Sequence, residues 1–183
     1  MSDALQVGVI GLRFGGQVHV PAFRSDERCQ VVGLAGRDPG SAERMALELG
    51  VPKSFADWRE LVAAPGIDAI GLAVPPSVQP VVIAEAARRG KHIFCEKPIA
   101  VSLVEARQAA KCAQAAPIVH GINFIFPELA AWKEARKLLM EGAIGRPLHF
   151  AYAWRVETYA SRTNARTWKS RPEEGGGALG NIL

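Results

Sequence analysis

A glycine-rich turn between a predicted strand and a predicted helix constrains this chain most. Leu5–Ile10 is apolar enough for a buried strand, Gly11-Leu-Arg-Phe-Gly-Gly16 predicts a tight turn, and residues 17–25 predict a helix. This order is typical of the phosphate-binding unit of a dinucleotide-binding fold. Arg13 stands where a middle glycine usually lets the backbone approach the pyrophosphate. It either crowds the phosphate or marks a shifted turn, since Gly15 adds a second flexible point nearby, and its guanidinium could also pair with the phosphate. An ordinary tight turn would suit the same glycines, and the motif alone leaves both interpretations open.

Segments typical of strands and helices alternate along the first two thirds of the chain. Apolar runs predict strands at residues 5–10, 29–35, 67–74, 92–95 and 118–121. Amphipathic runs between them predict helices at residues 17–25, 41–49, 57–63, 78–89 and 103–115. Ser41 and Ser102 are the expected N-caps, and Gly50 and Gly90 are the expected C-terminal stops. The alternation predicts an α/β fold, a Rossmann-type parallel sheet with crossover helices, over residues 1–122.

The pattern changes after Asn123. Residues 127–141 predict an amphipathic helix that ends at Gly142, and residues 148–156 alternate as a strand does. One strand cannot form a sheet alone, so we expect this strand to pair with another subunit or to remain poorly ordered.

Composition narrows the class of protein. Among 183 residues, 49% are hydrophobic and 22% charged, the balance of a soluble globular protein, and no apolar run approaches the roughly 20 residues that span a bilayer. The N-terminus lacks the pattern of a signal peptide. The three cysteines stand at spacings unlike those of metal ligands, which is typical of reduced thiols. These observations predict a cytoplasmic protein without a metal site.

Positive charge is concentrated near the end of the chain. Residues 155–171 contain five basic side chains and one acid, within a net charge of +4. The segment is either a solvated basic loop or an anion site for a cofactor phosphate or an acidic substrate. Nucleic acid is not expected as a partner, because the aromatic interleaving and reader motifs of nucleic-acid-binding proteins are missing.

The end of the second predicted strand decides which dinucleotide fits. An acid at this position accepts hydrogen bonds from the ribose 2′-hydroxyl of NAD, but Gly36 stands here and Arg37 follows. A small neutral residue leaves room for a 2′-phosphate, and an arginine pairs with it bidentately. NADP is therefore favoured and NAD stays possible. The alternative is that Arg37 is simply exposed in a loop.

Two further strand ends carry candidate site residues. Pro75 and Pro76 fix a rigid bend, which either only ends the strand or forms a wall beside the adenine or the nicotinamide. Glu96-Lys97-Pro98 follows a strand that is apolar on both faces. Lys97 is placed to donate to a substrate oxygen, and Glu96 to hold Lys97 or a ribose hydroxyl. A surface ion pair is the alternative, but the position in a dinucleotide-binding fold favours the chemical interpretation.

Five motifs spread over the chain form a set. They are Gly11-x-x-x-x-Gly16-x-x-His19, Ile67-Asp-Ala-Ile70 leading to Pro75-Pro-Ser77, Gly90-Lys-His-Ile-Phe-Cys-Glu-Lys-Pro98, Gly142-Ala-Ile-Gly145 and Glu174-Gly-Gly-Gly-Ala-Leu179. As a set they resemble the Gfo/Idh/MocA oxidoreductases, the glucose–fructose oxidoreductase and inositol dehydrogenase family. The resemblance covers essentially the whole chain. It implies a Rossmann domain followed by an α+β open-sheet domain, of which residues 123–183 are the incomplete start.

The resemblance also implies a reaction and its site. The reaction is hydride transfer between a nicotinamide cofactor and a hydroxyl or carbonyl carbon of a sugar, a polyol or a related small molecule. Lys97 is implied as the catalytic residue, in a neighbourhood that often contains a cis peptide. The expected cofactor-binding residues are Gly11, Arg13, Phe14, Gly16, Arg37, Pro75, Glu96 and Lys97.

The chain departs from the family pattern near its end. Asn181 replaces an aspartate that many members use, and the histidine that follows in the family falls beyond Leu183, so the chain resembles a member that stops early. The alternative function is therefore a catalytically impaired dinucleotide-binding module or sensor without the substrate half. The resemblance further predicts a homo-oligomer.

Overall fold

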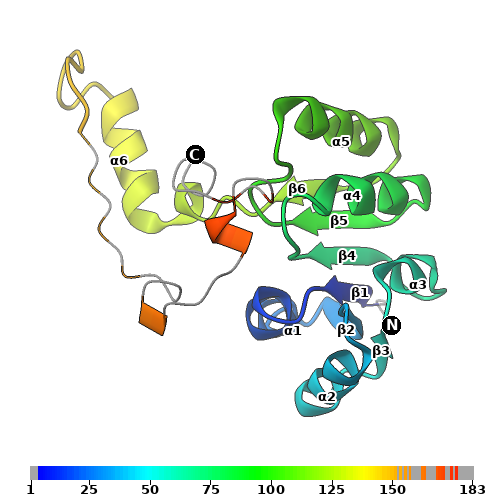
Figure 1. Cartoon of the computed structure of the whole chain (residues 1–183). Coiled ribbons are helices and arrows are strands. Elements are labelled where there is room, and N and C mark those ends of the chain that lie inside the picture. The colour runs from blue at the N-terminus through cyan, green and yellow to red at the C-terminus, as the bar shows by residue number, and fades with distance from the viewer. Residues whose placement is uncertain are drawn as a thin grey trace. The chain divides into compact units, whose positions relative to one another are not determined.

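A six-stranded parallel sheet forms the first of two compact units (Figure 1). The computed structural model describes residues 4–151, 153, 155, 157, 162–163, 168–171, 174 and 176. One unit spans residues 1–123 and 168–183, and the other spans residues 124–167. In sheet order the strands are β3 (Lys53–Phe55), β2 (Cys29–Ala35), β1 (Leu5–Ile10), β4 (Ala69–Leu72), β5 (His92–Cys95) and β6 (His120–Ile122). The strand order reverses between β1 and β4, where a Rossmann fold binds its dinucleotide. The expected α/β fold is confirmed.

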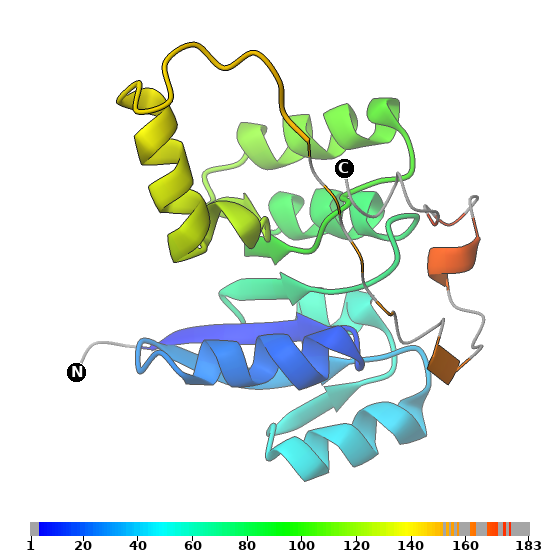
Figure 2. The same cartoon turned by 90° about the vertical axis from the view of Figure 1, so that its left-hand side faces the viewer.

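Helices cover both faces of this sheet. A π-helical turn, η1 (Gly15–His19), which contacts β1, continues into α1 (Val20–Arg24), which contacts β2; both lie in front of the sheet in Figure 2. The other helices of the unit are α2 (Pro39–Leu49), α3 (Trp58–Ala63), α4 (Gln79–Arg88), α5 (Leu103–Ala115) and the 3-10 turn η3 (Trp168–Ser170). Figure 1 shows α4 and α5 side by side near β5 and β6.

Two hydrophobic cores, one on each face, fix which helices lie together. Val7 and Val9 of β1 pack with Val20 of α1 on one face. Ile10 points to the other face and packs with residues of α3, α4 and α5. The alternation along β1 is what a strand covered on both faces requires, because successive side chains point to opposite faces.

Helix ends follow the sequence, with one correction. Ser102 caps α5 and Gly50 ends α2 in the left-handed conformation, both as predicted. Ser41 is not the cap of α2; the cap is Asp38, whose carboxylate accepts a hydrogen bond from the Ser41 N–H at 2.8 Å. The helix therefore starts at Pro39, because proline fits the first helical position, where no N–H is needed.

Other differences concern short elements. The strand β3 was not predicted, since its three residues are too few to show periodicity. The predicted strand at residues 67–74 is shortened to β4, and the one at residues 118–121 is shifted to β6. The helix predicted at residues 17–25 begins earlier, at Gly15, as a π-turn. Pro21 has no N–H and therefore cannot donate the hydrogen bond to the carbonyl four residues earlier that an α-helix would require here.

The described residues of the second unit, taken by itself, contain little regular structure. The helix predicted at residues 127–141 is the 3-10 turn η2 (Phe126–Glu128) followed by α6 (Ala130–Met140). At the described positions of the predicted strand, residues 148–151, 153 and 155, the structure has no strand, because no neighbouring strand pairs with them. The strand positions Tyr152, Trp154 and Val156 lie outside the described residues, as does Asn181. Within the described part of the chain, no helix is long and apolar enough to cross a membrane.

Candidate functional site

The carboxyl ends of five strands form one straight row. Ile10 pairs with Ala35 on one side and with Leu72 on the other, Leu72 pairs with Cys95, and Cys95 pairs with Ile122. The residues that follow directly are Gly36, Gly11, Ala73, Glu96 and Asn123. The strand ends that the sequence singled out therefore meet at one edge of the sheet, the edge at which such sheets bind ligands.

Gly11 starts the turn in a conformation that only glycine adopts easily. Its φ is +114°, and a Cβ on it would stand 2.2 Å from the carbonyl oxygen of Ala73. The turn therefore lies directly against the end of β4. Only a residue without a Cβ lets the ends of β1 and β4 approach so closely.

The rest of the turn leads into the start of the η1–α1 helix. A Cβ on Gly15 would contact Val9, and one on Gly16 would stand 2.5 Å from the sulfur of Met45, so both glycines permit close packing. A helix leaves its first N–H groups without an internal partner, which suits a pyrophosphate. Arg13 and Phe14 are exposed on this turn, Phe14 by 46%. Arg13 is therefore not packed in the interior of the fold.

The end of β2 differs from expectation in one respect. A Cβ on Gly36 would stand 2.6 Å from Leu12, so part of the room expected for a 2′-phosphate is taken by Leu12. Arg37 is exposed and, among the described residues, its guanidinium has no hydrogen-bond or ion-pair partner. The Asp38 carboxylate is committed to capping α2, and its hydrogen bonds to Ser41 hold its pKa below the usual value. An incoming phosphate would therefore meet Arg37 without a competing acid bound to it.

Pro75 lies in the turn between β4 and α4. Its carbonyl oxygen accepts hydrogen bonds from the N–H groups of Val78 and Gln79, at 2.9 and 3.3 Å. The side chain is half-buried, and Pro76 behind it is fully buried. The two prolines follow β4 and precede α4, as predicted.

Glu96 is held by two partners that come from distant parts of the sequence. Its Oε1 accepts a hydrogen bond from Asn123 Nδ2 at 2.6 Å and lies 2.9 Å from His19 Nε2. Burial pushes the pKa of Glu96 upward, but the hydrogen bonds from His19 and Asn123 and the nearby Lys97 charge outweigh it and leave the pKa below its ordinary value. The carboxylate is therefore ionised and cannot turn freely toward Lys97 or a ribose.

Lys97 is half-buried between two anchored neighbours. Glu96 precedes it, and Pro98 follows through the cis peptide that the resemblance implied. The Pro98 carbonyl accepts a hydrogen bond from Gln79 Nε2 at 2.7 Å.

Sequence reasoning did not select His19, Gln79 or Asn123 as site residues. His19 had appeared only as a motif position. The signal for Gln79 was weak: it is a polar residue at the start of an otherwise apolar helix face.

These residues fit a nicotinamide dinucleotide. Gly11 has no side chain that would block a phosphate, the helix that follows it starts with N–H groups suited to one, and the unpaired Arg37 can pair with one. No cluster of three histidine, cysteine, aspartate or glutamate side chains suited to a metal occurs among the described residues. The three cysteines are free thiols, as expected.

Comparison with known proteins identifies close relatives. The chain is 32% identical over 187 residues to levoglucosan dehydrogenase of Pseudarthrobacter phenanthrenivorans, covering 97% of this chain and 48% of that protein. It is 30% identical over 151 residues to scyllo-inositol 2-dehydrogenase (NAD(+)) of Bacillus subtilis, covering 82% and 44%. The crystal structure of an NAD binding oxidoreductase from Klebsiella pneumoniae superposes with a TM-score of 0.80 at 31% identity, covering 97% of this chain and 50% of that one.

The chain spans about half the length of the curated relatives that it matches. Those relatives are named dehydrogenases and act on a sugar or a polyol. The model of the oxidoreductase family with an NAD-binding Rossmann fold matches residues 5–124, well over half of the chain. By sequence and by fold, this chain therefore belongs to the Gfo/Idh/MocA oxidoreductase family.

Proposed function

We propose that the chain binds a nicotinamide dinucleotide, NADP in preference to NAD, and serves oxidation or reduction of a sugar, a polyol or a related hydroxyl or carbonyl compound. The observation that carries this proposal is the register of the sheet, which brings the glycine turn and the Glu96-Lys97-Pro98 segment to one edge. We further propose residues 1–122 as the cofactor domain and residues 123–183 as the start of the substrate domain.

The proposed roles follow from the placement of each residue. Gly11 and Gly16 allow the pyrophosphate to approach the helix start, and Arg13 and Phe14 border it from the exposed side of the turn. Pro75 forms a wall beside the adenine or the nicotinamide, and Glu96 fixes the segment that carries Lys97. Arg37 pairs with the 2′-phosphate.

Lys97 is the proposed catalytic residue. When bound, the nicotinamide accepts or supplies the hydride at the substrate carbon. Lys97 Nζ donates a hydrogen bond to the substrate oxygen and, in the direction of reduction, passes a proton to that oxygen. The half-buried position excludes part of the water that would otherwise compete for this oxygen. The predicted homo-oligomer and cytoplasmic location remain predictions.

A binding titration tests the cofactor proposal. NADPH and NADH are titrated against the wild-type chain, Arg37→Ala and the matched control Arg107→Ala, which removes an exposed charge from α5. A lost charge-assisted pair costs about 1.5–3 kcal/mol, so Arg37→Ala weakens NADPH binding roughly 10- to 100-fold and leaves NADH binding unchanged. Tighter binding of NADH than of NADPH by the wild type overturns the NADP preference. Binding of neither overturns the site.

A turnover assay tests the role of Lys97. Oxidation of a panel of sugars and polyols with the preferred cofactor is followed for the wild type, Lys97→Met and Lys97→Arg. Activity that persists in Lys97→Met contradicts the catalytic role. Cofactor binding without turnover of any compound favours the alternative function, a dinucleotide-binding module.

A further inference from the structure

Two buried polar side chains lie behind the proposed catalytic segment. His19 is 2% exposed and Gln79 is 1% exposed, and within the described part of the chain they are the only buried polar or charged residues. Polar side chains are uncommon in such positions, because burial costs free energy unless a hydrogen bond compensates it. Both of them form their hydrogen bond with the same tripeptide, residues 96–98.

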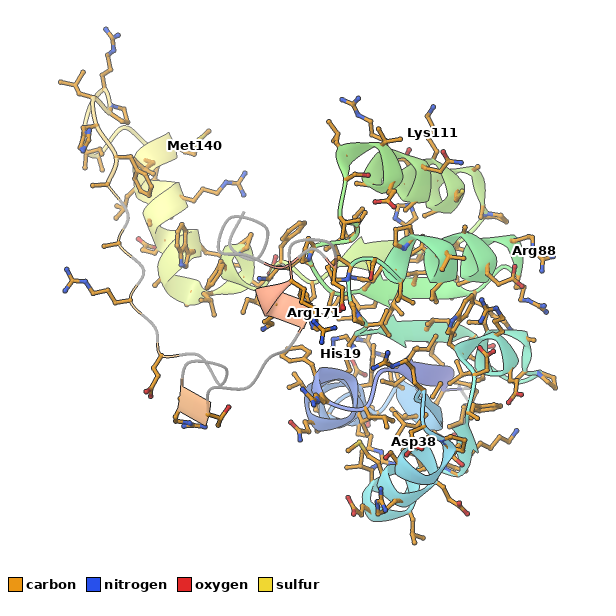
Figure 3. All side chains as sticks on the ribbon, in the orientation of Figure 1. His19, Asp38, Arg88, Lys111, Met140 and Arg171 are labelled. Carbon is orange, nitrogen blue, oxygen red and sulfur yellow. The ribbon has the colours of Figure 1, made fainter. Side chains whose placement is uncertain are left out.

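His19 holds the first residue of this segment. Its Nε2 lies 2.9 Å from Glu96 Oε1, and its ring contacts Phe14, Phe23 and Phe94 at centroid distances of 5.5 to 6.1 Å. The aromatic surroundings exclude water, so the hydrogen bond to the carboxylate is strong. Figure 3 labels His19 on the helix that follows the glycine turn.

Gln79 holds the last residue of the segment. Its Nε2 donates to the Pro98 carbonyl at 2.7 Å, and Gln79 is itself fixed as the first residue of α4. Lys97 stands between the two anchored residues. Its backbone position is therefore set from both sides by side chains of other elements.

Each anchor leaves one polar atom without a partner. Among the described residues, His19 Nδ1 and Gln79 Oε1 are buried and form no hydrogen bond. An unsatisfied buried polar atom lowers the free energy of unfolding, and apolar side chains of similar volume would avoid that cost. What an apolar side chain could not do is bind the Glu96 carboxylate or the Pro98 carbonyl.

We propose that His19 and Gln79 are positioning residues for Lys97: His19 acts through the Glu96 carboxylate, and Gln79 acts through the Pro98 carbonyl. His19 also ties the position of Lys97 to the helix that starts at the glycine turn. The inference rests on the proposed role of Lys97 in the reaction. Its structural half, the position of Lys97, can be measured without any cofactor.

The test compares three variants of the full chain. His19→Phe keeps the aromatic bulk and removes the donor, His19→Gln keeps an Nε2 donor, and Gln79→Met keeps the length and removes the donor. The lysines are labelled by reductive ¹³C-methylation, and the Lys97 signal is assigned by its loss in Lys97→Arg. Lys91, whose Nζ donates to the Ile67 carbonyl, is the internal control.

The Lys97 methyl signal is expected to shift in His19→Phe and Gln79→Met and to stay at the wild-type position in His19→Gln. The Lys91 signal stays unchanged in all three variants. If turnover is found, kcat falls about 10- to 100-fold in the first two variants with little change in the KM for cofactor, because a small misplacement of a reacting group is that costly.

An unchanged Lys97 signal in folded His19→Phe and Gln79→Met overturns the inference. If the Lys97 signal shifts as far in His19→Gln as in His19→Phe, the claim that the His19 donor positions Lys97 is overturned. If His19→Phe does not fold, as judged by circular dichroism, Gln79→Met decides the outcome. Failure of the wild type to bind NADPH or NADH refutes the proposed function and leaves this measurement intact, so the two failures are distinguishable.

Discussion

Replacing Gly11 by alanine tests the geometry of the turn most directly. Its φ of +114° lies outside the ordinary left-handed region, which costs a non-glycine residue about 1–3 kcal/mol. The new Cβ would stand 2.2 Å from the Ala73 carbonyl oxygen, a backbone atom that cannot rotate away. Forcing β1 and β4 apart adds about 1–3 kcal/mol, as overpacking does. Gly11→Ala is therefore expected to destabilise the sheet unit by about 2–6 kcal/mol.

Gly50→Ala is the matched control. Gly50 also has a positive φ, +60°, but nothing lies within 4 Å of a Cβ built on it. Its cost is limited to the left-handed conformation, about 1–2 kcal/mol. The entropy that alanine removes from the unfolded chain is common to both variants and cancels in the comparison.

Urea unfolding followed by far-UV circular dichroism measures both free energies of unfolding, with the slope m checked for constancy. The midpoints of the two ranges differ by about 2–3 kcal/mol, so we expect Gly11→Ala to be less stable than Gly50→Ala by that amount and to bind NADPH more weakly if it folds. Equal destabilisation of the two variants would refute the close contact between the turn and the end of β4.

Three further predictions concern single side chains. Burial and then the Glu96 charge raise the pKa of Cys95 from 9.0 to about 12. Cys95 is therefore expected to react about 1000-fold more slowly with a disulfide reagent than an exposed thiol. Rapid reaction of all three cysteines in a thiol-reactivity assay contradicts this. The ionised Glu96 carboxylate, whose pKa is lowered against burial by hydrogen bonds such as that from His19, stabilises the fold above pH 4.5, and this contribution is lost as the pH falls through the folded pKa. The Tm difference between the wild type and Glu96→Gln therefore shrinks from pH 7 to pH 3, and a constant difference speaks against the ionised pair. Ser102→Ala costs about 1 kcal/mol in urea unfolding because the Glu105 N–H loses its acceptor, whereas Ser102→Thr, which keeps the hydroxyl, retains most of the stability; equal loss in both variants excludes capping as the cause.

The strands and their ends could be predicted because their signals are local. The strands β1, β2 and β5 have the predicted bounds, since each is a short apolar run stopped by glycine or charge. The cap of α2 was misassigned because Asp38 and Ser41 are both good caps and only the backbone geometry distinguishes them. The strand β3 could not be predicted, because its pairing with β2 defines it and its own three residues do not.

The second unit shows where local patterns fail. The alternation at residues 148–156 is a genuine strand pattern, yet the described residues there form no strand. Periodicity reports which side chains share a face, but a strand also needs the backbone hydrogen bonds of a neighbour. That neighbour is a property of the tertiary or quaternary structure and cannot be inferred from the strand itself.

By itself, the sequence determined the alternating fold, the glycine turn and the position of Lys97 at a strand end, because these depend on residues adjacent in the chain. Only the tertiary structure decided that His19, Gln79 and Asn123 form hydrogen bonds with the two residues that flank Lys97. Their partners lie 19 to 77 residues away in sequence, and no local pattern encodes a hydrogen bond over such a separation. The physical reason is that a buried polar side chain needs a hydrogen-bond partner, and which group lies next to it is decided by the packing of the whole fold.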